Sequence, residues 1–324
     1  MLRIYLDQNH WIYLSRALNN KPRSLAEADA ALFIQTSIDA GQASYPLSVA
    51  HVEETWRQRR AAKRLPLADT MTAISRNHTI APPWTVVPAE IDRALLTRFG
   101  EPQDLRPLQP FGIGMHHMSG GLLPEPDAAI VRALQSKHPH LGRRQITDMI
   151  DAILLSGPAA DLPIGGLRPP SRAPAEAFAR AEQEVLSTLA AHESDSDERR
   201  RVVAGRMFMD LRDAIHEAQL RTSISTDEIL ALGSEGITEF MMDLPSRVAL
   251  LELVTQQHRN PQTIWHANDR NDLVYTSLAV GYCDIVVTER RWAANLNNSG
   301  VPARMGTKIL RRLQDLPQAV LDLG

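Results

Sequence analysis

Short apolar runs and helical repeats alternate along the chain, and strand-like runs occur near both of its ends. Residues 2–6 form an apolar run typical of a buried strand, and residues 43–47 predict a second strand after a helix over about 25–40. Near the C-terminus, a helical run over 271–282 leads into a further buried strand over 284–288. Strands that alternate with helices in this way predict an α/β fold with a parallel sheet.

Helical periodicity dominates the chain between these two ends. From Ser48, apolar positions recur at helical spacing through about residue 76. Residues 80–170 contain most of the Pro and Gly residues and predict loops, with one firm helix at about 145–156. Further helices are predicted at about 174–192, 197–221, 226–232 and 245–258. Ser225 and Glu228 predict a capping box for the third of these.

The composition is that of a protein with a large buried core. The chain has 324 residues, of which 44% are hydrophobic, and we expect an α/β domain over 1–90 and 265–324 with a mainly helical insertion over 91–264. The single Cys283 excludes an internal disulfide framework and fits a reducing compartment. No secretory leader is evident, and no stretch approaches the roughly 20 apolar residues of a membrane span. A cytoplasmic location without a membrane partner is therefore expected.

The charge balance limits the class of partner. A formal net charge of -3 argues against a protein that coats polyanions, because such proteins are usually strongly basic. It does not exclude a nuclease. An enzyme that clusters carboxylates around a divalent metal lowers its own net charge while it keeps local basic patches for phosphates.

Asp7 is the first candidate for such a carboxylate. It follows the first predicted strand directly, and open α/β sheets bind their ligands at the carboxyl ends of the strands. The structural alternative is that Asp7 caps a helix that starts near Asn9. Asp7 therefore needs partners elsewhere in the chain before it indicates a site.

Two further groups of polar residues follow the other predicted strands. Glu53 and Glu54 lie in the first turns of the helix after the second strand, where acidic residues also complement the helix dipole. Asn271 and Asp272 open a helix, and Thr288, sixteen residues beyond Asp272, ends the last strand. Parallel strands place these positions at the same edge of a sheet.

In these three pieces the sequence resembles the PIN-like nuclease family. Asp7, within Ile4-Tyr5-Leu6-Asp7-Gln8-Asn9, stands in the place of the first family aspartate. The segment from Pro46 to Glu54 matches the family's second-strand serine, here Ser48, and its helix glutamate. The segments Asn271-Asp272 and 284–288 match the third aspartate and the strand that ends in threonine. The matching parts cover about 1–90 and 265–310.

The resemblance implies a Rossmann-like parallel sheet flanked by helices, with a site that holds Mg²⁺ or Mn²⁺ and cleaves phosphodiester bonds by activated water. It assigns metal-ligand roles to Asp7, Asp272 and Glu54, and Glu54 fits the family pattern better than Glu53 because a threonine follows it. Hard divalent cations prefer such oxygen ligands. Supporting roles fall to a set of neutral polar residues, Asn9, Ser48, Asn271 and Thr288.

One position departs from the family pattern. Many members have a further Asp or Asn two residues after the threonine, and here that residue is Arg290. Glu289 or Asp284 could replace it, so we include both as candidate catalytic residues, although Asp284 precedes its strand and is expected nearer the wrong end of the sheet. A site that holds only one metal firmly is the alternative.

Basic and aromatic residues near these motifs are candidates for substrate contact. Arg57 and Arg60 continue the predicted helix of Glu54 and could contact phosphates. Trp11 and Trp292 lie close to the acidic motifs and could stack on bases, although core packing is the ordinary role of tryptophan. The His116-His117 pair predicts a flexible loop in preference to a zinc site, because neither a Cys nor a His-x-x-x-His partner accompanies it.

The leading hypothesis is an endoribonuclease with Mg²⁺ or Mn²⁺ as cofactor and RNA as substrate, in which the helical insertion shapes substrate access. RNA is preferred over DNA by the habits of the family. A role as a toxin or in antiviral defence is the extension, with an inhibitor protein as a candidate partner. Two alternatives remain open, a PIN-like scaffold or nucleic-acid-binding protein without turnover, and a DNA nuclease. The sequence indicates no oligomeric state.

Overall fold

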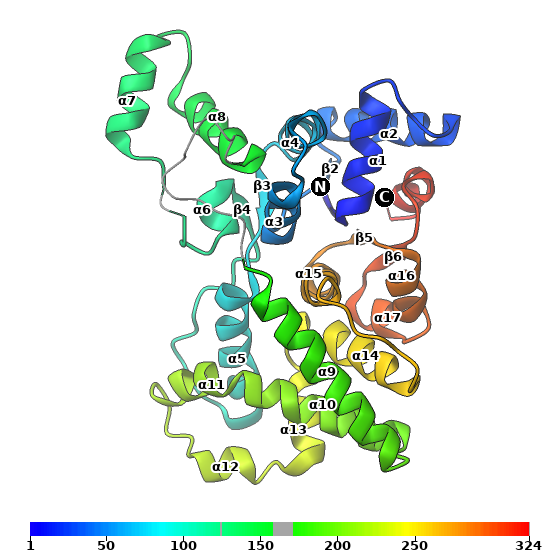
Figure 1. Ribbon diagram of the computed structural model, residues 1–324. Coiled ribbons are helices and arrows are strands. Elements are labelled where there is room, and N and C mark those ends of the chain that lie inside the picture. The colour runs from blue at the N-terminus through cyan, green and yellow to red at the C-terminus, as the bar shows by residue number, and fades with distance from the viewer. Residues whose placement is uncertain (124, 158–170, 324) are drawn as a thin grey trace.

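A four-stranded parallel sheet joins the two ends of the chain in the computed structural model, which describes residues 1–123, 125–157 and 171–323. Its order is β2-β1-β5-β6. Figure 1 shows the first, blue elements and the last, red elements together around this sheet. The bounds of the strands are Leu2–Leu6 for β1, Ala43–Ser44 for β2, Ile285–Val287 for β5 and Lys308–Leu310 for β6. The predicted α/β class is confirmed.

Both faces of the sheet are buried, and the side chains of β1 and β5 alternate between two cores. Ile4 pairs with Ile285 and Leu6 with Val287, and these four side chains belong to one core cluster. Tyr5, between them, belongs to the other cluster. Parallel strands with helices on both faces require such continuous apolar runs, which explains why residues 2–6 are almost entirely hydrophobic.

The helices of the N-terminal third follow the predicted order with one break. They are α1 (Gln8–Leu18), α2 (Leu25–Asp39), α3 (Val49–Arg57) and α4 (Ala61–Ser75). The prediction of one helix from Ser48 to residue 76 is wrong, because Gln58 and Arg60 are extended. Arg64 stabilises the break: its Nη1 donates to the Gln58 carbonyl and its Nε to the Ser156 carbonyl, a tertiary contact that local periodicity does not reveal.

The loop prediction for residues 80–170 is wrong over much of its length. The predicted helix at 145–156 is confirmed, but a two-stranded antiparallel sheet and three further helices accompany it. These elements are β3 (His78–Ile80), α5 (Pro83–Phe99), β4 (Phe111–Ile113), α6 (Gly114–Met118), α7 (Ala128–Lys137) and α8 (Arg143–Ser156). Pro83 misled the prediction, because proline at the first position of a helix loses no hydrogen bond. The Pro and Gly residues within 158–170 lie outside the described residues.

The C-terminal half is helical up to the last two strands. The predicted helices at 174–192, 226–232 and 245–258 are confirmed, with the Ser225 capping box, whereas the helix predicted at 197–221 is divided at Leu211. The helices are α9 (Ala173–Ala191), α10 (Ser196–Asp210), α11 (Arg212–Gln219), α12 (Thr226–Leu230), α13 (Gly233–Met242), α14 (Pro245–Arg259), α15 (Asp269–Tyr282), α16 (Arg290–Asn297), α17 (Val301–Met305), η1 (Leu313–Asp315) and α18 (Leu316–Leu321).

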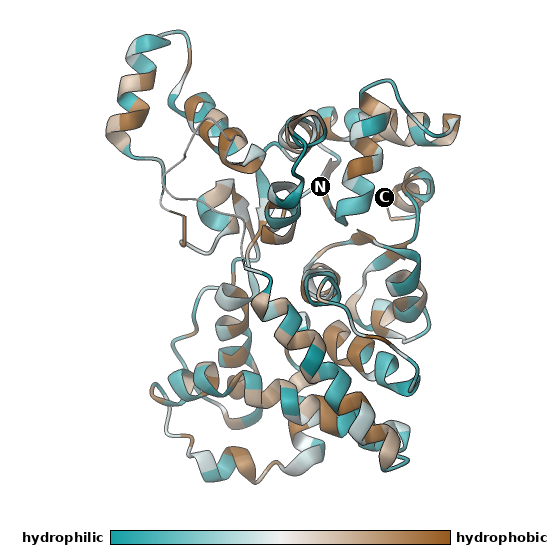
Figure 2. Cartoon of the chain, viewed as in Figure 1, coloured by the Kyte–Doolittle hydropathy of each residue, from teal (hydrophilic) through white to brown (hydrophobic). Residues whose placement is uncertain are grey.

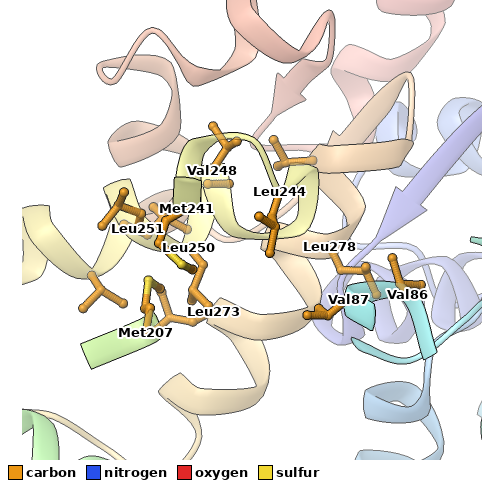
Figure 3. Close-up of a cluster of buried hydrophobic side chains, with 14 of the residues drawn as sticks. Val86, Val87, Met207, Met241, Leu244, Val248, Leu250, Leu251, Leu273 and Leu278 are labelled. Carbon is orange, nitrogen blue, oxygen red and sulfur yellow. The ribbon is translucent and has the colours of Figure 1, made fainter. Parts of the chain in front are cut away.

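One apolar core connects the helical middle of the chain to the sheet. Figure 3 shows side chains of α5, α10, α14 and α15 packed together, among them Val87, Met207, Leu250 and Leu278. The same cluster contains Tyr5 of β1, so these helices also cover one face of the sheet. In Figure 2, hydrophobic and hydrophilic residues share each of these helices, as burial of a single helical face requires.

No helix in the described ranges has the length and apolar character that a membrane crossing requires. The longest helix, α9, carries charged residues such as Glu176 and Arg180 within its length.

Close packing of α15 against α14 yields a stability prediction. A Cβ atom added at Gly281 would lie 2.8 Å from the backbone oxygen of Pro245, which cannot move independently of α14. We expect Gly281→Ala to lower the free energy of unfolding by about 1–3 kcal/mol, as overpacking does. Gly205→Ala is the matched control: Gly205 lies in α10 with open space around it, so alanine there should raise stability by about 0.5–1 kcal/mol. Urea unfolding of both variants checks this, and an unchanged midpoint for Gly281→Ala would contradict the close contact.

Candidate active site

Asp7 lies where β1 ends and α1 begins, at the carboxyl edge of the sheet. Its backbone N–H donates to the Val287 carbonyl at 3.0 Å, which ties it to the end of β5. Its Oδ1 accepts from the backbone N–H of His10 at 3.1 Å, so Asp7 does cap the helix. Its Oδ2 is buried and has no hydrogen-bond partner among the described residues. One oxygen therefore serves the fold, and the other is available to a ligand.

His10 holds the capping oxygen of Asp7 in place. Its Nδ1 lies 2.5 Å from Asp7 Oδ1, and its Nε2 lies 3.2 Å from the Arg311 carbonyl. Both ring nitrogens thus face acceptors. Burial disfavours the charged ring, but the charge and hydrogen bond of Asp7 outweigh it, so the pKa of His10 is raised above its usual value. A protonated His10 satisfies both contacts and offsets part of the charge of Asp7.

Glu54 reaches the same edge from α3. His51, one turn earlier, joins α3 to β1: the backbone N–H of Ser48 donates to His51 Nδ1 at 2.8 Å, and His51 Nε2–H donates to the Leu6 carbonyl at 2.8 Å. Leu6 directly precedes Asp7. This fully buried ring therefore places Glu54 and Asp7 relative to each other.

Asp272 comes from the first turn of α15. The indole N–H of Trp292 lies 3.5 Å from Asp272 Oδ2, and the neighbouring Asn271 Nδ2 donates to Glu53 Oε2 at 3.0 Å. Glu53 also lies 3.5 Å from Arg57. Glu53 is thus engaged by neighbours while Glu54 faces Asp7 and Asp272, in agreement with the preference for Glu54.

The end of β5 completes the site. Thr288 is buried and its Oγ1 has no hydrogen-bond partner in the described part of the chain. Glu289, the next residue, is exposed and accepts from the side-chain amide of Asn9. These two residues follow β5 just as Asp7 follows β1.

The carboxylates of Asp7, Glu54, Asp272 and Glu289 line one polar cavity of about 370 Å³. Thr288 lines a small hollow of about 20 Å³ that also borders Asp7, Glu54 and Asp272. The larger cavity is lined by Asp7, Gln8, Asn9, Glu54, Arg57, Gln58, Arg172, Asn268, Asn271, Asp272 and Glu289. Four carboxylates share this cavity with two arginines.

Burial and mutual repulsion raise the pKa values of the Glu54 and Asp272 carboxyl groups. Burial, and then the charges of Asp272 and Asp7, raise the pKa of Glu54 to about 8. Burial, and then Glu289 and Asp7, raise the pKa of Asp272 to about 7, although the Trp292 contact opposes this. Carboxylates that share a site behave in this way when no cation compensates them.

The residues fit a hard divalent cation by their chemistry. The buried, unpartnered Asp7 Oδ2 and the repelling carboxylates of Glu54 and Asp272 are the oxygen donors that Mg²⁺ prefers. No group of three or more His, Cys, Asp or Glu side chains within the described ranges is arranged to hold a metal ion as it stands. The carboxylates would have to converge further to bind one.

Several predicted residues lie elsewhere. Asp284 is at the opposite edge of the sheet, where its Oδ2 accepts from the Arg3 backbone N–H at 2.7 Å, because it precedes β5 and cannot reach the carboxyl end. Arg60 is exposed at the start of α4, since the helix breaks before it. Ser48 lies beneath the site, 3.2 Å from the Tyr5 hydroxyl. The prediction that Asp284 and Arg60 belong to the site is therefore wrong.

The tryptophans proposed to stack on bases are buried. Trp11 and Trp292 are 0% and 1% exposed, so neither presents a face on which a base could stack. His116 and His117 point to different partners, the Leu123 carbonyl and the Thr79 hydroxyl. Trp84, which the sequence did not single out, is 48% exposed on α5.

Among the residues that line or support the site, the sequence analysis did not single out His51, His10, Arg172, Gln58 or Asn268. His51 stands three positions after Ser48, the spacing of a capping box, which was the available signal. His10 and Arg172 give no comparable local signal.

Comparison of the chain with protein-family models, with curated proteins and with solved structures finds no match. The residues and their geometry are therefore what supports a function.

His51 gives the site a pH-dependent stability. Burial lowers its pKa from 6.5 to about 4, although the Leu6 carbonyl and Asp7 oppose this. The unfolded chain therefore takes up a proton as the pH falls through 6.5 and the folded chain does not, which removes about 3 kcal/mol of stability by pH 4. We expect the free energy of unfolding, measured with urea, to fall more steeply for wild type than for His51→Gln between pH 6.5 and 4. Parallel curves for the two proteins would exclude this role.

Proposed function

We propose that this protein is a metal-dependent nuclease with a PIN-like site, and that it acts as an endoribonuclease. The observation that carries the proposal is the convergence of Asp7, Glu54 and Asp272, from three distant segments, at the carboxyl edge of a parallel sheet. Ligand sites of open α/β sheets lie at this edge. Glu289 adds a fourth carboxylate from the neighbouring strand end.

The proposed cation ligands are Asp7 through its unpartnered Oδ2, Asp272 and Glu54. When bound, Mg²⁺ or Mn²⁺ would lower the pKa of a water and offset negative charge at the scissile phosphate. His10 and Trp292 hold the outward orientation of Asp7 and Asp272 through their ring N–H groups. Such neighbours of metal ligands commonly fix ligand geometry.

Basic residues around the acidic cavity supply contacts for a phosphate backbone. Arg57 and Arg172 line the cavity itself. Gln58 also borders a second hollow of about 530 Å³, whose basic residues are Arg16, Lys21 and Lys63. A strand that runs from one hollow into the other would meet positive charge on both sides of the carboxylates, which suits nucleic acid. The preference for RNA rests on the family resemblance.

A scaffold without turnover is the second candidate. The carboxylates do not yet form a closed metal site, and Arg290 begins α16 at the position where the family has an acidic residue. Cleavage assays separate this candidate, and the DNA nuclease, from the proposed function.

Substitution of the ligands tests the activity. With Mn²⁺ and end-labelled structured RNA, single-stranded DNA and duplex DNA, we expect cleavage of RNA by wild type. Asp7→Asn, Glu54→Gln and Asp272→Asn should each slow it at least about 100-fold, because several kcal/mol of transition-state stabilisation depend on the cation. Asp284→Asn, at the opposite edge, is the matched control and should retain activity. Equal rates for Asp7→Asn and wild type would refute the assignment, and cleavage of DNA alone would favour the DNA nuclease.

The raised pKa values of about 8 for Glu54 and about 7 for Asp272 predict a pH-dependent response to metal. Both lie above the ordinary values, so the stability that these groups contribute is lost as the pH rises through 7 to 8 and they ionise together. A cation requires the ionised forms. We expect Mg²⁺ to raise the melting temperature more at pH 8 than at pH 6, and Asp272→Asn to remove most of the difference. A rise that is no larger at pH 8 would contradict the proposed ligands.

A further inference from the structure

A further cavity, of about 260 Å³, lies between the helices next to the acidic site. Its wall includes Trp84, Phe178 and Tyr275 as aromatic residues, Met207 as an apolar residue, and Arg247 and Asp210 as charged residues. We call it the Arg247 cavity. Met207 and Leu250, which also lines it, appear in Figure 3 and connect it to the main core.

The Arg247 cavity and the acidic cavity share a wall. In α3, Glu53 borders the Arg247 cavity and Glu54 borders the acidic one; in α15, Arg270 borders the first and Asn271 the second. The hydrogen bond from Asn271 to Glu53 forms the partition. A strand held at the carboxylates would therefore lie next to the Arg247 cavity.

Arg247 faces the carboxylates of Glu90 and Asp210 through space, but it makes no ion pair with either of them within 4 Å. Its Nε is buried and has no hydrogen-bond partner among the described residues. Glu90, which acts on it through space, already accepts from the backbone N–H and the hydroxyl of Ser246 and from the hydroxyl of Tyr282. By contrast, Arg206 in the same wall lies 3.0 Å from Glu182. A buried N–H group without an acceptor is costly, so an acceptor from a ligand would satisfy the Arg247 Nε.

The walls decide which acceptors fit. Trp84, Phe178 and Tyr275 line the same cavity as Arg247, and aromatic residues stack on nucleobases in proteins that bind single strands. Arginine pairs most often with the adjacent O6 and N7 acceptors of guanine. Asp210, in the same wall, is an acceptor for the N1–H and amino donors on the other edge of guanine. Guanine presents both edges at once.

We propose that the Arg247 cavity binds one unpaired guanine base of the substrate strand, next to the phosphate that is cleaved. Arg247 donates to O6 and N7, Asp210 accepts from the opposite edge, and Trp84 with Phe178 and Tyr275 encloses the ring. The inference rests on the proposed function, since the acidic site is what makes a nucleic acid the neighbouring ligand. It makes the enzyme selective for a sequence in single-stranded RNA.

Calorimetric titration of the full chain with guanosine, adenosine, cytidine and uridine 5′-monophosphates, in EDTA, tests the proposal without cleavage. Guanosine monophosphate should bind tightest. Arg247→Met should weaken its binding about 5- to 150-fold, the equivalent of the about 1–3 kcal/mol of a bidentate pair. Arg201→Met, an exposed position on α10, is the matched control and should leave binding unchanged.

Asp210→Asn keeps the proposal testable if the Arg247 variant does not fold, because Asp210 is exposed at the end of α10. This substitution should weaken the binding of guanosine monophosphate and leave the weaker binding of uridine monophosphate unchanged. Guanosine monophosphate that binds no more tightly than the pyrimidine nucleotides, or equally to both variants and wild type, overturns the inference. If the protein binds guanosine monophosphate but cleaves no nucleic acid, the nuclease assignment is wrong and the guanine site remains. If it cleaves RNA but does not bind guanosine monophosphate, only the guanine site is wrong.

Discussion

Parallel hydrogen bonding between β1 and β5 is the constraint on which the site depends. It joins strands from opposite ends of the chain, and the Asp7 N–H extends the pairing to the Val287 carbonyl. Asp7 and Thr288 therefore emerge side by side where the two strands end. The helical middle packs into the same core as Tyr5, so closing this long loop also buries apolar surface, which offsets its entropic cost.

The same constraint brings together charges that repel one another. Asp7, Glu54 and Asp272 could each be stabilised by water at the surface, but the fold buries them side by side and raises the pKa of the latter two. His10 contacts one oxygen of Asp7, and the neutral ring of His51 holds the two strand-end segments together. An arrangement that lowers stability and is held by specific contacts is typical of sites whose ligand supplies the missing charge.

The sequence predicted β1, β5 and the short β2 of the sheet, but not β6. It also named the carboxylates that lie at the carboxyl edge, because strands and strand-end carboxylates follow from local rules. It failed where tertiary contacts decide. Arg64 divides the helix that was predicted from Ser48 to 76 and thereby moves Arg60 away from the site. Trp11 and Trp292 are buried in the core, which is the ordinary role of tryptophan. Asp284 was included as a replacement for the family's further acidic residue, and it lies at the opposite edge, as its place before the strand had indicated. Arg172 and Arg247 reach their cavities from helices far along the chain.

Crystals of the protein soaked in Mn²⁺ and measured at the manganese absorption edge test the central claim most directly. The account predicts an anomalous peak between Asp7 and Asp272, about 2.0–2.2 Å from a carboxylate oxygen of each, with Glu54 turned toward it. A peak at Asp284 or elsewhere, or no peak while the carboxylates of Asp7 and Asp272 remain apart, would contradict a metal-dependent site at this edge of the sheet.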